Sequence, residues 1–441
     1  MSRISGDSGQ HKGLSMGRTW SRREALRAAG MGAVGGAMWV SDVPGASGAA
    51  AAQAPGQIAG QREGAQAGAT ILEAGGNAVD AIVTAAFTAC VVAIPSCGIG
   101  GYGGHLVVAS SNGRDVSSVD FNSEAPAAAR PDMYPLGPDG KVVGNVQNIG
   151  WRSVGVPGTL AGLERALTRY GRLPLRDVLE PAIRYCRTGV PVGPGLARAI
   201  QNSRAVLSRD PGASALLLPG GEPPAAGSLL TNPALGELLA TLAARNSVRS
   251  FYEGDIAVRL AEAFARHDGL VTAADLAAYQ ARDVKPLALR WGEYTIHTAP
   301  LTAGGLSVLQ ALQVLQAGDW PALAADSRRA LHFRLEALRT VWHDRLALLG
   351  DPQTREVPTD RLLSTQYARE TAARVGKAVA EGRQLAGGTD GRSAGGTIHL
   401  SAVDRDGSMA AMTLTHGEGF GGRVAAGELG LLLGHGLSRF D

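Results

Sequence analysis

The chain has 441 residues, 45% of them hydrophobic and 18% charged, a balance typical of a globular protein. Its net charge of +3 comes from residues 1–52, which hold six basic and three acidic groups and leave 36 of each sign in the remainder. An electrically balanced body offers no basic surface for nucleic acid, so we expect no nucleic-acid partner.

The first 52 residues are typical of an export signal. The pair Arg22-Arg23 precedes a mildly apolar stretch, residues 25–40, and then a region of small residues, 45–54. This order, with paired arginines, is typical of a twin-arginine signal peptide. The apolar stretch is shorter than the ~20 residues that a spanning helix needs. We therefore expect residues 1–52 to direct twin-arginine export to the periplasm or the medium, with no membrane attachment after signal cleavage.

Helical patterns dominate the region that follows. Residues 63–94 predict a helix that is interrupted at Gly75-Gly76-Asn77, where a helix end is followed by a new N-cap. Residues 105–110 and 116–121 predict a β-hairpin. The stretch 159–239 reads as mostly helical, and residues 250–350 alternate helices with a short strand at 294–297.

A glycine run, residues 98–104, contains a formal G-x-G-x-x-G pattern. A dinucleotide site needs that turn between a strand and a following helix. Here a helix precedes the run and a strand follows it. We therefore predict close backbone packing at this place and no nucleotide cofactor.

The three cysteines, Cys90, Cys97 and Cys186, lack the spacing of a metal site, and we expect no metal. The sequence leaves open whether two of them form a disulfide in an oxidising compartment. Cys90 lies in an apolar helical run, which favours a buried thiol.

The most informative place is the end of a polar, glycine-rich stretch, residues 383–396, which predicts an exposed loop. Residues 397–403 then alternate in polarity, a turn follows at 404–407, and residues 408–415 return as a second strand. This hairpin places Thr397 opposite a residue between 413 and 416.

Thr397 becomes a candidate nucleophile if the Gly396–Thr397 bond is cut. Cleavage would give Thr397 a free α-amino group, whose pKa of ~7.7–8 allows it to act as the base for its own hydroxyl. Gly395-Gly396 would allow the precursor backbone to bend so that the hydroxyl reaches the preceding carbonyl. From the residues alone, an ordinary junction of loop and strand remains the competing interpretation.

Eight ordered segments of the chain resemble motifs of the γ-glutamyltranspeptidases, a family of N-terminal nucleophile hydrolases. The segments are residues 71–81, 96–104, 156–162, 170–174, 251–254, 275–279, 350–352 and 397–404. The last of them, Thr397-Ile-His-Leu-Ser-Ala-Val-Asp404, is similar to the family's cleavage-site segment.

The resemblance implies an α+β fold, the four-layer αββα sandwich of this superfamily. It implies cleavage between Gly396 and Thr397 into a large-subunit region, residues 57–396, and the start of a small-subunit region, residues 397–441, which stay associated as a heterodimer. It also implies that Thr397 is the nucleophile and that Thr415 hydrogen-bonds to it. The expected activity is hydrolysis or transfer of γ-glutamyl amide groups, as in glutathione, without a cofactor.

Two segments depart from the family pattern. The family binds the substrate α-carboxylate with the arginine of a D-F-R-E segment, where this chain has Asn122, and an asparagine does not replace a guanidinium clamp. The family's N-N-x-M-D-D-F segment reads Gly434-His-Gly-Leu-Ser-Arg-Phe440 here, so Arg439 stands at the place of an acid that holds the α-amino group. Asn122 and Arg439 are therefore candidate substrate-binding residues, and they favour a related amide acylase with non-glutamyl substrates as the alternative enzyme.

The family sequence also continues beyond the position that matches Asp441, through segments that close over the substrate and form the oxyanion hole. The sequence therefore leaves open a truncated reading frame, with the C-terminal part of the sandwich missing, or a decayed relative. The alternative from another functional class is an exported scaffold without catalysis.

Overall fold

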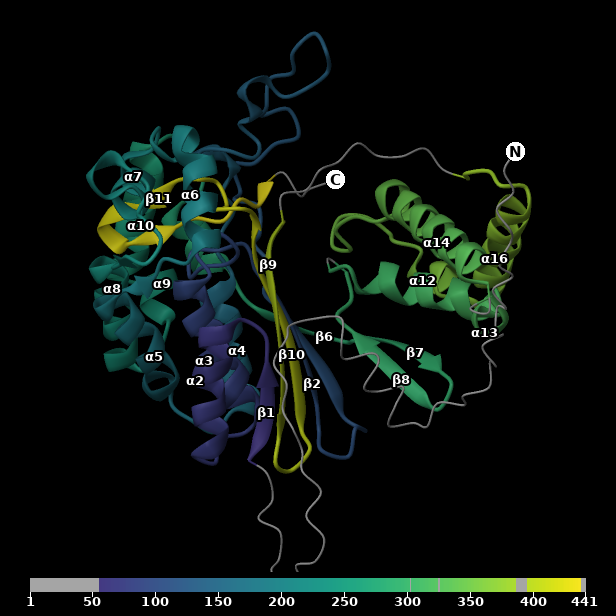
Figure 1. Ribbon diagram of the computed structural model, residues 1–441. Coiled ribbons are helices and arrows are strands. Elements are labelled where there is room, and N and C mark those ends of the chain that lie inside the picture. Colours follow the sequence, from purple (N-terminus) through teal and green to yellow (C-terminus); the bar gives the residue numbers. More distant parts are fainter. Residues whose placement is uncertain (1–54, 302, 324–325, 386–394, 438–441) are drawn as a thin grey trace, which may run out of the picture. The chain divides into compact units, whose positions relative to one another are not determined.

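The structure is a computed structural model that describes residues 55–301, 303–323, 326–385 and 395–437. Its centre is a six-stranded antiparallel sheet in the order β1-β9-β10-β2-β3-β6 (Figure 1). The strands are β1 (Gly56–Ala59), β2 (Gly103–Ala109), β3 (Val116–Asp120), β6 (Arg282–Val284), β9 (Gly395–Asp404) and β10 (Met409–Glu418). The export signal predicted for residues 1–52 lies outside the described residues.

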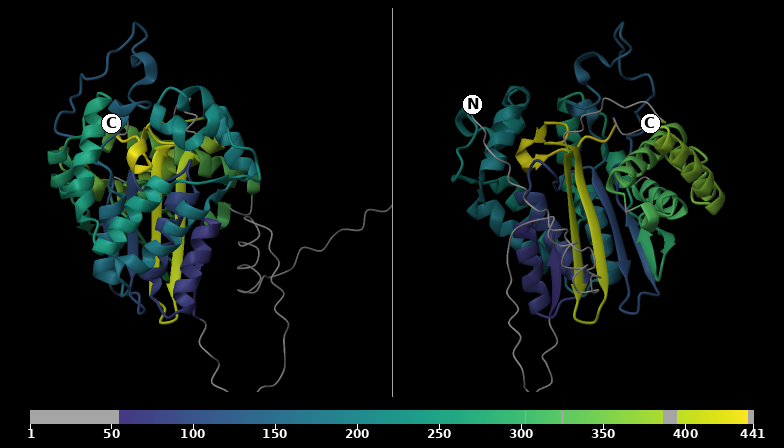
Figure 2. Two further views of the ribbon diagram at one scale, coloured as in Figure 1. Left: turned by 90° about the vertical axis from the view of Figure 1, so that its left-hand side faces the viewer. Right: turned by 45° about the vertical axis from the view of Figure 1, so that its right-hand side comes forward.

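Two strands from the C-terminal part of the chain occupy the interior of this sheet. β9 pairs with β1 on one side and with β10 on the other, and β10 pairs with β2. Figure 2 shows the long β9–β10 hairpin flanked by helices. Thr397 therefore begins a strand that is held between two neighbours.

One face of the sheet is covered by helices. The helix α3 (Ala78–Val92) packs against β9 and β10, and all of its residues are buried. Asn77 caps its first turn, because the Asn77 side chain accepts from the amides of Val79 and Asp80 while the Asp80 carboxylate accepts from the Asn77 amide. The apolar residues of β9 and β10, such as Leu400 and Met412, face this helix-covered side and are buried.

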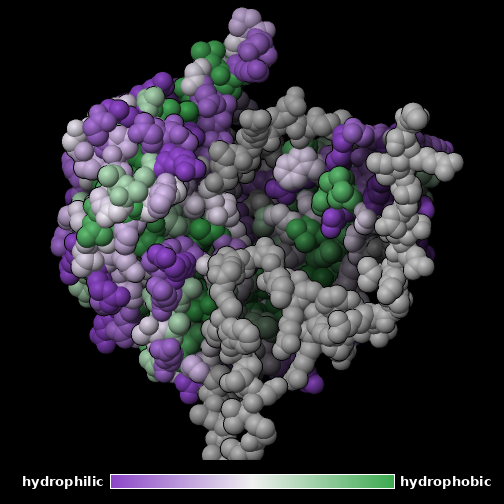
Figure 3. All heavy atoms as spheres, in the orientation of Figure 1, coloured by the Kyte–Doolittle hydropathy of each residue, from purple (hydrophilic) through white to green (hydrophobic). Residues whose placement is uncertain are grey.

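The remaining helices of the first part are α2 (Arg62–Glu73), α4 (Thr159–Tyr170), α5 (Leu175–Thr188), α6 (Pro194–Leu207), α7 (Pro211–Leu217), α8 (Pro233–Arg245), α9 (Arg249–Glu253), α10 (Asp255–Arg266) and α11 (Ala273–Ala278). The helices α2, α4 and α5 pack against α3, α8 packs on α5, and α9, α10 and α11 pack on one another. Polar and charged residues predominate on the surface that carries α5, α8 and α10, with small hydrophobic patches between them (Figure 3).

A separate hairpin, β7 (Leu287–Trp291) and β8 (Tyr294–Thr298), precedes a second group of helices. In this group α12 packs on β7, and α12, α14 and α16 pack on one another. The bounds are α12 (Gly305–Ala317), α13 (Trp320–Leu323), α14 (Ser327–Leu348), α15 (Thr359–Leu362) and α16 (Thr365–Ala380). Four two-residue strands form two short pairs in the described residues: β4 (Val190–Pro191) with β5 (Leu229–Leu230), and β11 (Ala425–Ala426) with β12 (Leu431–Leu432).

The fold confirms the α+β class and the predicted break at Gly75-Gly76-Asn77. The strands β1 and β6 were not predicted, because four and three residues are too few to show a period. The strand β7 was not predicted either, although its residues alternate in burial. Within the described ranges, no helix is both long and apolar enough to cross a membrane.

Candidate active site

Thr397 and Thr415 are direct partners across the β9–β10 pair, within the interval 413–416 that the hairpin predicts. Residues directly opposite each other in an antiparallel pair project from the same face of the sheet. Both threonines project from the face opposite α3, and Thr397 is exposed there. Their hydroxyl oxygens are 2.9 Å apart.

The Thr415 hydroxyl also contacts the bond predicted to be cut. It donates to the carbonyl oxygen of Gly396 at 2.6 Å and accepts from the amide of Gly417 at 2.8 Å. Because its single proton goes to Gly396, the Thr397 hydroxyl is the donor in the pair of threonines. A directed chain of hydrogen bonds therefore runs from Thr397 through Thr415 to the Gly396 carbonyl.

A shift of strand register beside these hydrogen bonds allows the Gly417 amide to donate to the Thr415 hydroxyl. The pairing shifts between Thr415 and Gly417, so Gly417 lies opposite Gly396 and Glu418 lies opposite Gly395. Gly417 has a φ of +94°, in the region that favours glycine. This irregularity turns the Gly417 amide toward the Thr415 hydroxyl, a contact that sequence periodicity does not indicate.

The glycine run 98–104 serves close backbone packing, as expected. It follows α3 and leads into β2, the order opposite to that of a dinucleotide site. A Cβ at Gly104 would overlap the carbonyl oxygen of Thr413, and one at Gly103 would overlap that of Phe121. The run thus lets β2 lie directly against β10, with Gly103 opposite Thr415.

Asn122 lies at the same end of the sheet as the threonine pair. A Cβ at Gly103 would come within 3.3 Å of the Asn122 Cα, and Gly103 is the cross-strand partner of Thr415. Asn122 is buried, its amide donates to Asp120 at 3.0 Å, and its carbonyl accepts from the Tyr279 hydroxyl at 2.8 Å. Arg439, the other candidate substrate-binding residue, lies outside the described residues.

A second polar row crosses the sheet next to the threonine pair. Successive partners across β9, β10, β2, β3 and β6 are His399, Thr413, His105, Asp120 and Arg282. The cross-strand partners Thr397, Thr415 and Gly103 form a first row, which we call the nucleophile row after its candidate nucleophile. His399, Thr413 and His105 lie two residues from these three, respectively, so the two rows are about 7 Å apart on one face.

Side-chain contacts join the members of this row. The Nδ1 atom of His399 lies 2.8 Å from the Thr413 hydroxyl, and the Nε2 atom of His105 lies 3.2 Å from an Asp120 carboxylate oxygen. Arg282 approaches the other Asp120 oxygen at 3.5 Å. Burial lowers the pKa of both histidines, and at His105 the Asp120 charge opposes that effect. These side chains form a polar row beside Thr397 that the sequence did not predict.

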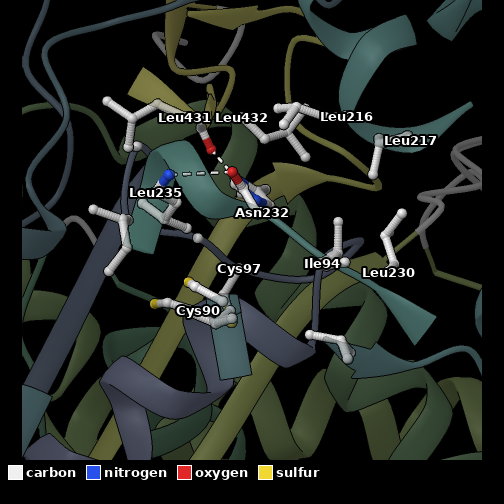
Figure 4. Close-up of a pocket in the computed structure, with 18 of the residues that line it drawn as sticks. Cys90, Ile94, Cys97, Leu216, Leu217, Leu230, Asn232, Leu235, Leu431 and Leu432 are labelled. Atoms are coloured by element: carbon white, nitrogen blue, oxygen red, sulfur yellow. Dashed lines mark hydrogen bonds between the residues drawn. The ribbon is translucent and has the colours of Figure 1, made fainter. Parts of the chain in front are cut away.

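The three cysteines are buried free thiols that line a small cavity of about 50 Å³ (Figure 4). His416 also lines it. Since His416 follows Thr415 in a strand, its side chain points to the opposite face of the sheet. The cavity therefore lies on the face of the sheet opposite Thr397, and neither Thr397 nor Thr415 lines it. In the described part of the chain, no three His, Cys, Asp or Glu side chains are grouped as metal ligands.

Comparison with known proteins defines the class to which this fold and threonine pair belong. Residues 64–441 match the family model described as "Gamma-glutamyltranspeptidase", so the chain belongs to the γ-glutamyltranspeptidase family. It is 33% identical over 380 residues to the "Glutathione hydrolase proenzyme" of Escherichia coli strain K12, covering 85% of this chain and 65% of the relative. It is 34% identical over 381 residues to the "Acylase ACY 1 proenzyme" of Pseudomonas sp. strain V22, covering 85% and 67%. The chain thus spans about two thirds of the length of these relatives.

Solved structures agree with this assignment. The γ-glutamyltranspeptidase of Helicobacter pylori matches with a TM-score of 0.68 and 29% identity, over 71% of this chain and 90% of that chain. The cephalosporin acylase of Bacillus halodurans matches with a TM-score of 0.72 and 25% identity, over 91% and 73%. The fold is therefore that of the N-terminal nucleophile hydrolases of this family.

Proposed function

We propose that the chain cleaves itself between Gly396 and Thr397 and then hydrolyses or transfers acyl groups from γ-glutamyl-type amides. The observation that carries this proposal is the hydrogen-bond chain from Thr397 through Thr415 to the Gly396 carbonyl. A hydroxyl beside a carbonyl that is already polarised by a second donor is arranged for acyl transfer.

In the first stage the Thr397 oxygen attacks the Gly396 carbonyl carbon. A C–O bond forms, the C–N bond breaks, and the Thr397 nitrogen gains the proton that the hydroxyl loses. The Thr415 hydroxyl stabilises the negative charge that develops on the Gly396 oxygen. Water then hydrolyses the ester, which leaves a Gly396 carboxylate and a free α-amino group on Thr397.

In the second stage the free amine acts as the base for the Thr397 hydroxyl, since its pKa of ~7.7–8 leaves a neutral fraction near pH 7. Thr397 attacks the substrate amide and forms an acyl ester, and the amine of the leaving group departs with the proton. Water or an amino-acid amine releases the acyl group. The fragments 57–396 and 397–441 remain together because β9 is paired on both sides.

The second candidate is an amide acylase that acts on non-glutamyl acyl groups. Asn122 supports it, because this buried residue lies beside the nucleophile row without the charge of an arginine. Relatives named acylase, at 34% and 33% identity, support it as well. We also propose that the protein is exported by the twin-arginine route, on the strength of Arg22-Arg23 and the region that follows them.

The test combines a gel and an assay. Denaturing electrophoresis and N-terminal sequencing of the purified protein should show two fragments, the smaller beginning at Thr397, and Thr397→Ala should remain one chain. The cleaved protein should release p-nitroaniline from γ-glutamyl p-nitroanilide. Intact wild-type protein with unchanged chain length would refute the enzyme and favour the scaffold. Cleaved protein that prefers a neutral acyl anilide would favour the acylase.

A further inference from the structure

An ion pair between Glu418 and Arg423 lies at the end of β10, beside the residues that precede Thr397. An oxygen of the Glu418 carboxylate lies 3.3 Å from the Arg423 guanidinium. Glu418 is opposite Gly395, which is two residues from Thr397, so its side chain projects from the nucleophile face. The pair therefore lies about 7 Å along the strand from the threonines.

The segment that carries this pair is held in place by backbone and core contacts. The Phe420 amide donates to the Pro95 carbonyl at 2.9 Å, and the Gly422 amide donates to the Leu433 carbonyl at 2.9 Å. Phe420 and Arg423 have φ values of +64° and +58°, an uncommon conformation for residues other than glycine. Backbone in such a conformation persists only where its surroundings hold it, and it is frequent at ligand sites.

The Arg423 side chain is 15% exposed and retains hydrogen-bonding capacity that the uncleaved chain does not use. One of its terminal nitrogens, Nη2, faces Glu418, and the other, Nη1, is buried and has no hydrogen-bond partner in the structure. An unsatisfied buried donor on a charged group is costly. A carboxylate is the acceptor that best matches a guanidinium.

The precursor itself shows where an acyl group would lie. The same Thr397 oxygen attacks first the Gly396 carbonyl and then the substrate carbonyl, so the substrate acyl chain takes the place of the residues before Thr397. Those residues lie tightly against the end of β10, since a Cβ at Gly396 would be 2.6 Å from the Glu418 carbonyl oxygen. Cleavage of the Gly396–Thr397 bond would remove the covalent link that holds Gly395 and Gly396 beside Thr397.

The number of bonds along the acyl group places its far end, the end away from the scissile carbonyl, beside the Glu418–Arg423 ion pair. Three bonds back from the Gly396 carbonyl carbon, through its Cα and nitrogen, lead to the carbonyl carbon of Gly395, which lies opposite Glu418. A carbon three bonds from the carbonyl is also where a γ-glutamyl or glutaryl group carries its carboxylate.

We propose that Arg423, held by Glu418, is the residue that selects acyl groups whose carboxylate is attached to the carbon three bonds from the scissile carbonyl carbon. This inference rests on the proposed function and assigns the specificity of the same site. Arg423 binds the carboxylate through the nitrogen that is unsatisfied in the precursor, and Glu418 orients the guanidinium.

The experiment compares three anilides on the self-cleaved protein: γ-glutamyl, glutaryl and butyryl p-nitroanilide. Arg423→Gln should lower kcat/KM for the two carboxylate-bearing substrates by about tenfold to a hundredfold, the range of a charge-assisted hydrogen bond, and leave butyryl turnover unchanged. Glu418→Gln should lower kcat/KM for the same two substrates by a smaller factor. Arg249→Gln, which removes an exposed Arg249–Glu253 pair at 2.9 Å far along the chain, is the matched control.

Isothermal titration with glutarate provides a reading that does not depend on turnover. Self-cleaved wild type should bind glutarate, and self-cleaved Arg423→Gln should bind it at least tenfold more weakly. Parallel loss on all three anilides, or equal glutarate binding by both proteins, would overturn the role of Arg423. Failure of the wild type to cleave itself or to turn over any anilide would instead refute the proposed function.

Discussion

The hydroxyl of Thr415 lies 2.9 Å from the Thr397 hydroxyl and 2.6 Å from the Gly396 carbonyl oxygen, so one side chain contacts both the proposed attacking atom and the oxygen of the carbonyl that it is proposed to attack. Neither contact would exist without the register in which β9 and β10 pair. The proposed self-cleavage step would consequently depend on Thr415, a residue that is remote in sequence from the Gly396–Thr397 bond.

Replacement of Thr415 by valine should slow self-cleavage by about 10²-fold, because it removes a donor to the oxygen on which negative charge develops. Thr415→Ser keeps the hydroxyl and should cleave at close to the wild-type rate. The measurement is the cleaved fraction against time on a denaturing gel. Thr413→Val is the matched control, since it removes a β10 hydroxyl that contacts His399 and not Gly396. Equal rates for Thr415→Val and wild type would contradict the role given to Thr415.

Gly104→Ala should destabilise the fold by about 3 kcal/mol, because the added methyl group overlaps the Thr413 carbonyl oxygen and pushes β2 from β10. Gly195→Ala is the control, since no atom lies within 4 Å of a Cβ there and Gly195 is in the first turn of α6. The measurement is the free energy of unfolding of the two variants and the wild type, from urea titration. A Gly104→Ala protein as stable as Gly195→Ala would mean that the strands can separate without cost.

The buried imidazole of His416 should make stability fall in acid. Burial, with a smaller effect from His435, lowers the pKa of His416 to about 3. Because the unfolded histidine has a pKa of ~6.5, the unfolded chain binds a proton between pH 6.5 and about 3 that the folded chain does not. The free energy of unfolding should therefore be greatest above pH 6.5 and decrease by up to about 1.4 kcal/mol per pH unit below it.

The check on His416 is a series of urea titrations from pH 7.5 to 4.5 on wild type and His416→Gln. The variant should lose stability less steeply as the pH falls, whatever its stability at pH 7.5. Identical slopes in the two proteins would show that His416 does not contribute to the acid dependence.

The cysteines should be unreactive until the protein unfolds. A hydrogen bond with Cys90, together with burial, raises the pKa of Cys97 well above its usual range, and burial raises the pKa of Cys186 to about 12, so these two thiols carry little thiolate at pH 8. Ellman's reagent should label no thiol rapidly in the native protein and three per chain in guanidinium chloride. Rapid native labelling would contradict the burial, and fewer than three thiols after unfolding would reveal a disulfide.

Local pattern was sufficient for much of the fold. The capping residue Asn77, the alternation after Thr397 and the turn at 404–407 are local signals, because each is read from a few neighbouring residues. Each of them specified an element that the structure contains. The hairpin length limited the partner of Thr397 to residues 413–416, and Thr415 lies within that interval. The short strand β1 escaped prediction because four residues carry too little periodicity.

The candidate site divides in the same way. Thr397, Gly396 and Thr415 could be named from a local hairpin and a family motif. The second polar row could not, because His399, His105, Asp120 and Arg282 come from four strands whose order in the sheet is not written in any one of them. Glu418 and Arg423 were missed because their position depends on the register shift after Thr415 and on contacts of their segment with Pro95 and Leu433.

The sequence by itself determined most of the helices, the β9–β10 hairpin, the candidate nucleophile Thr397 and the short interval that faces it, since hydrophobic period, turn chemistry and hairpin length act over short distances along the chain. Only the tertiary structure decided what surrounds that nucleophile, because the charges and hydrogen-bond donors on one face of the sheet are brought together by pairing between strands that are far apart in sequence.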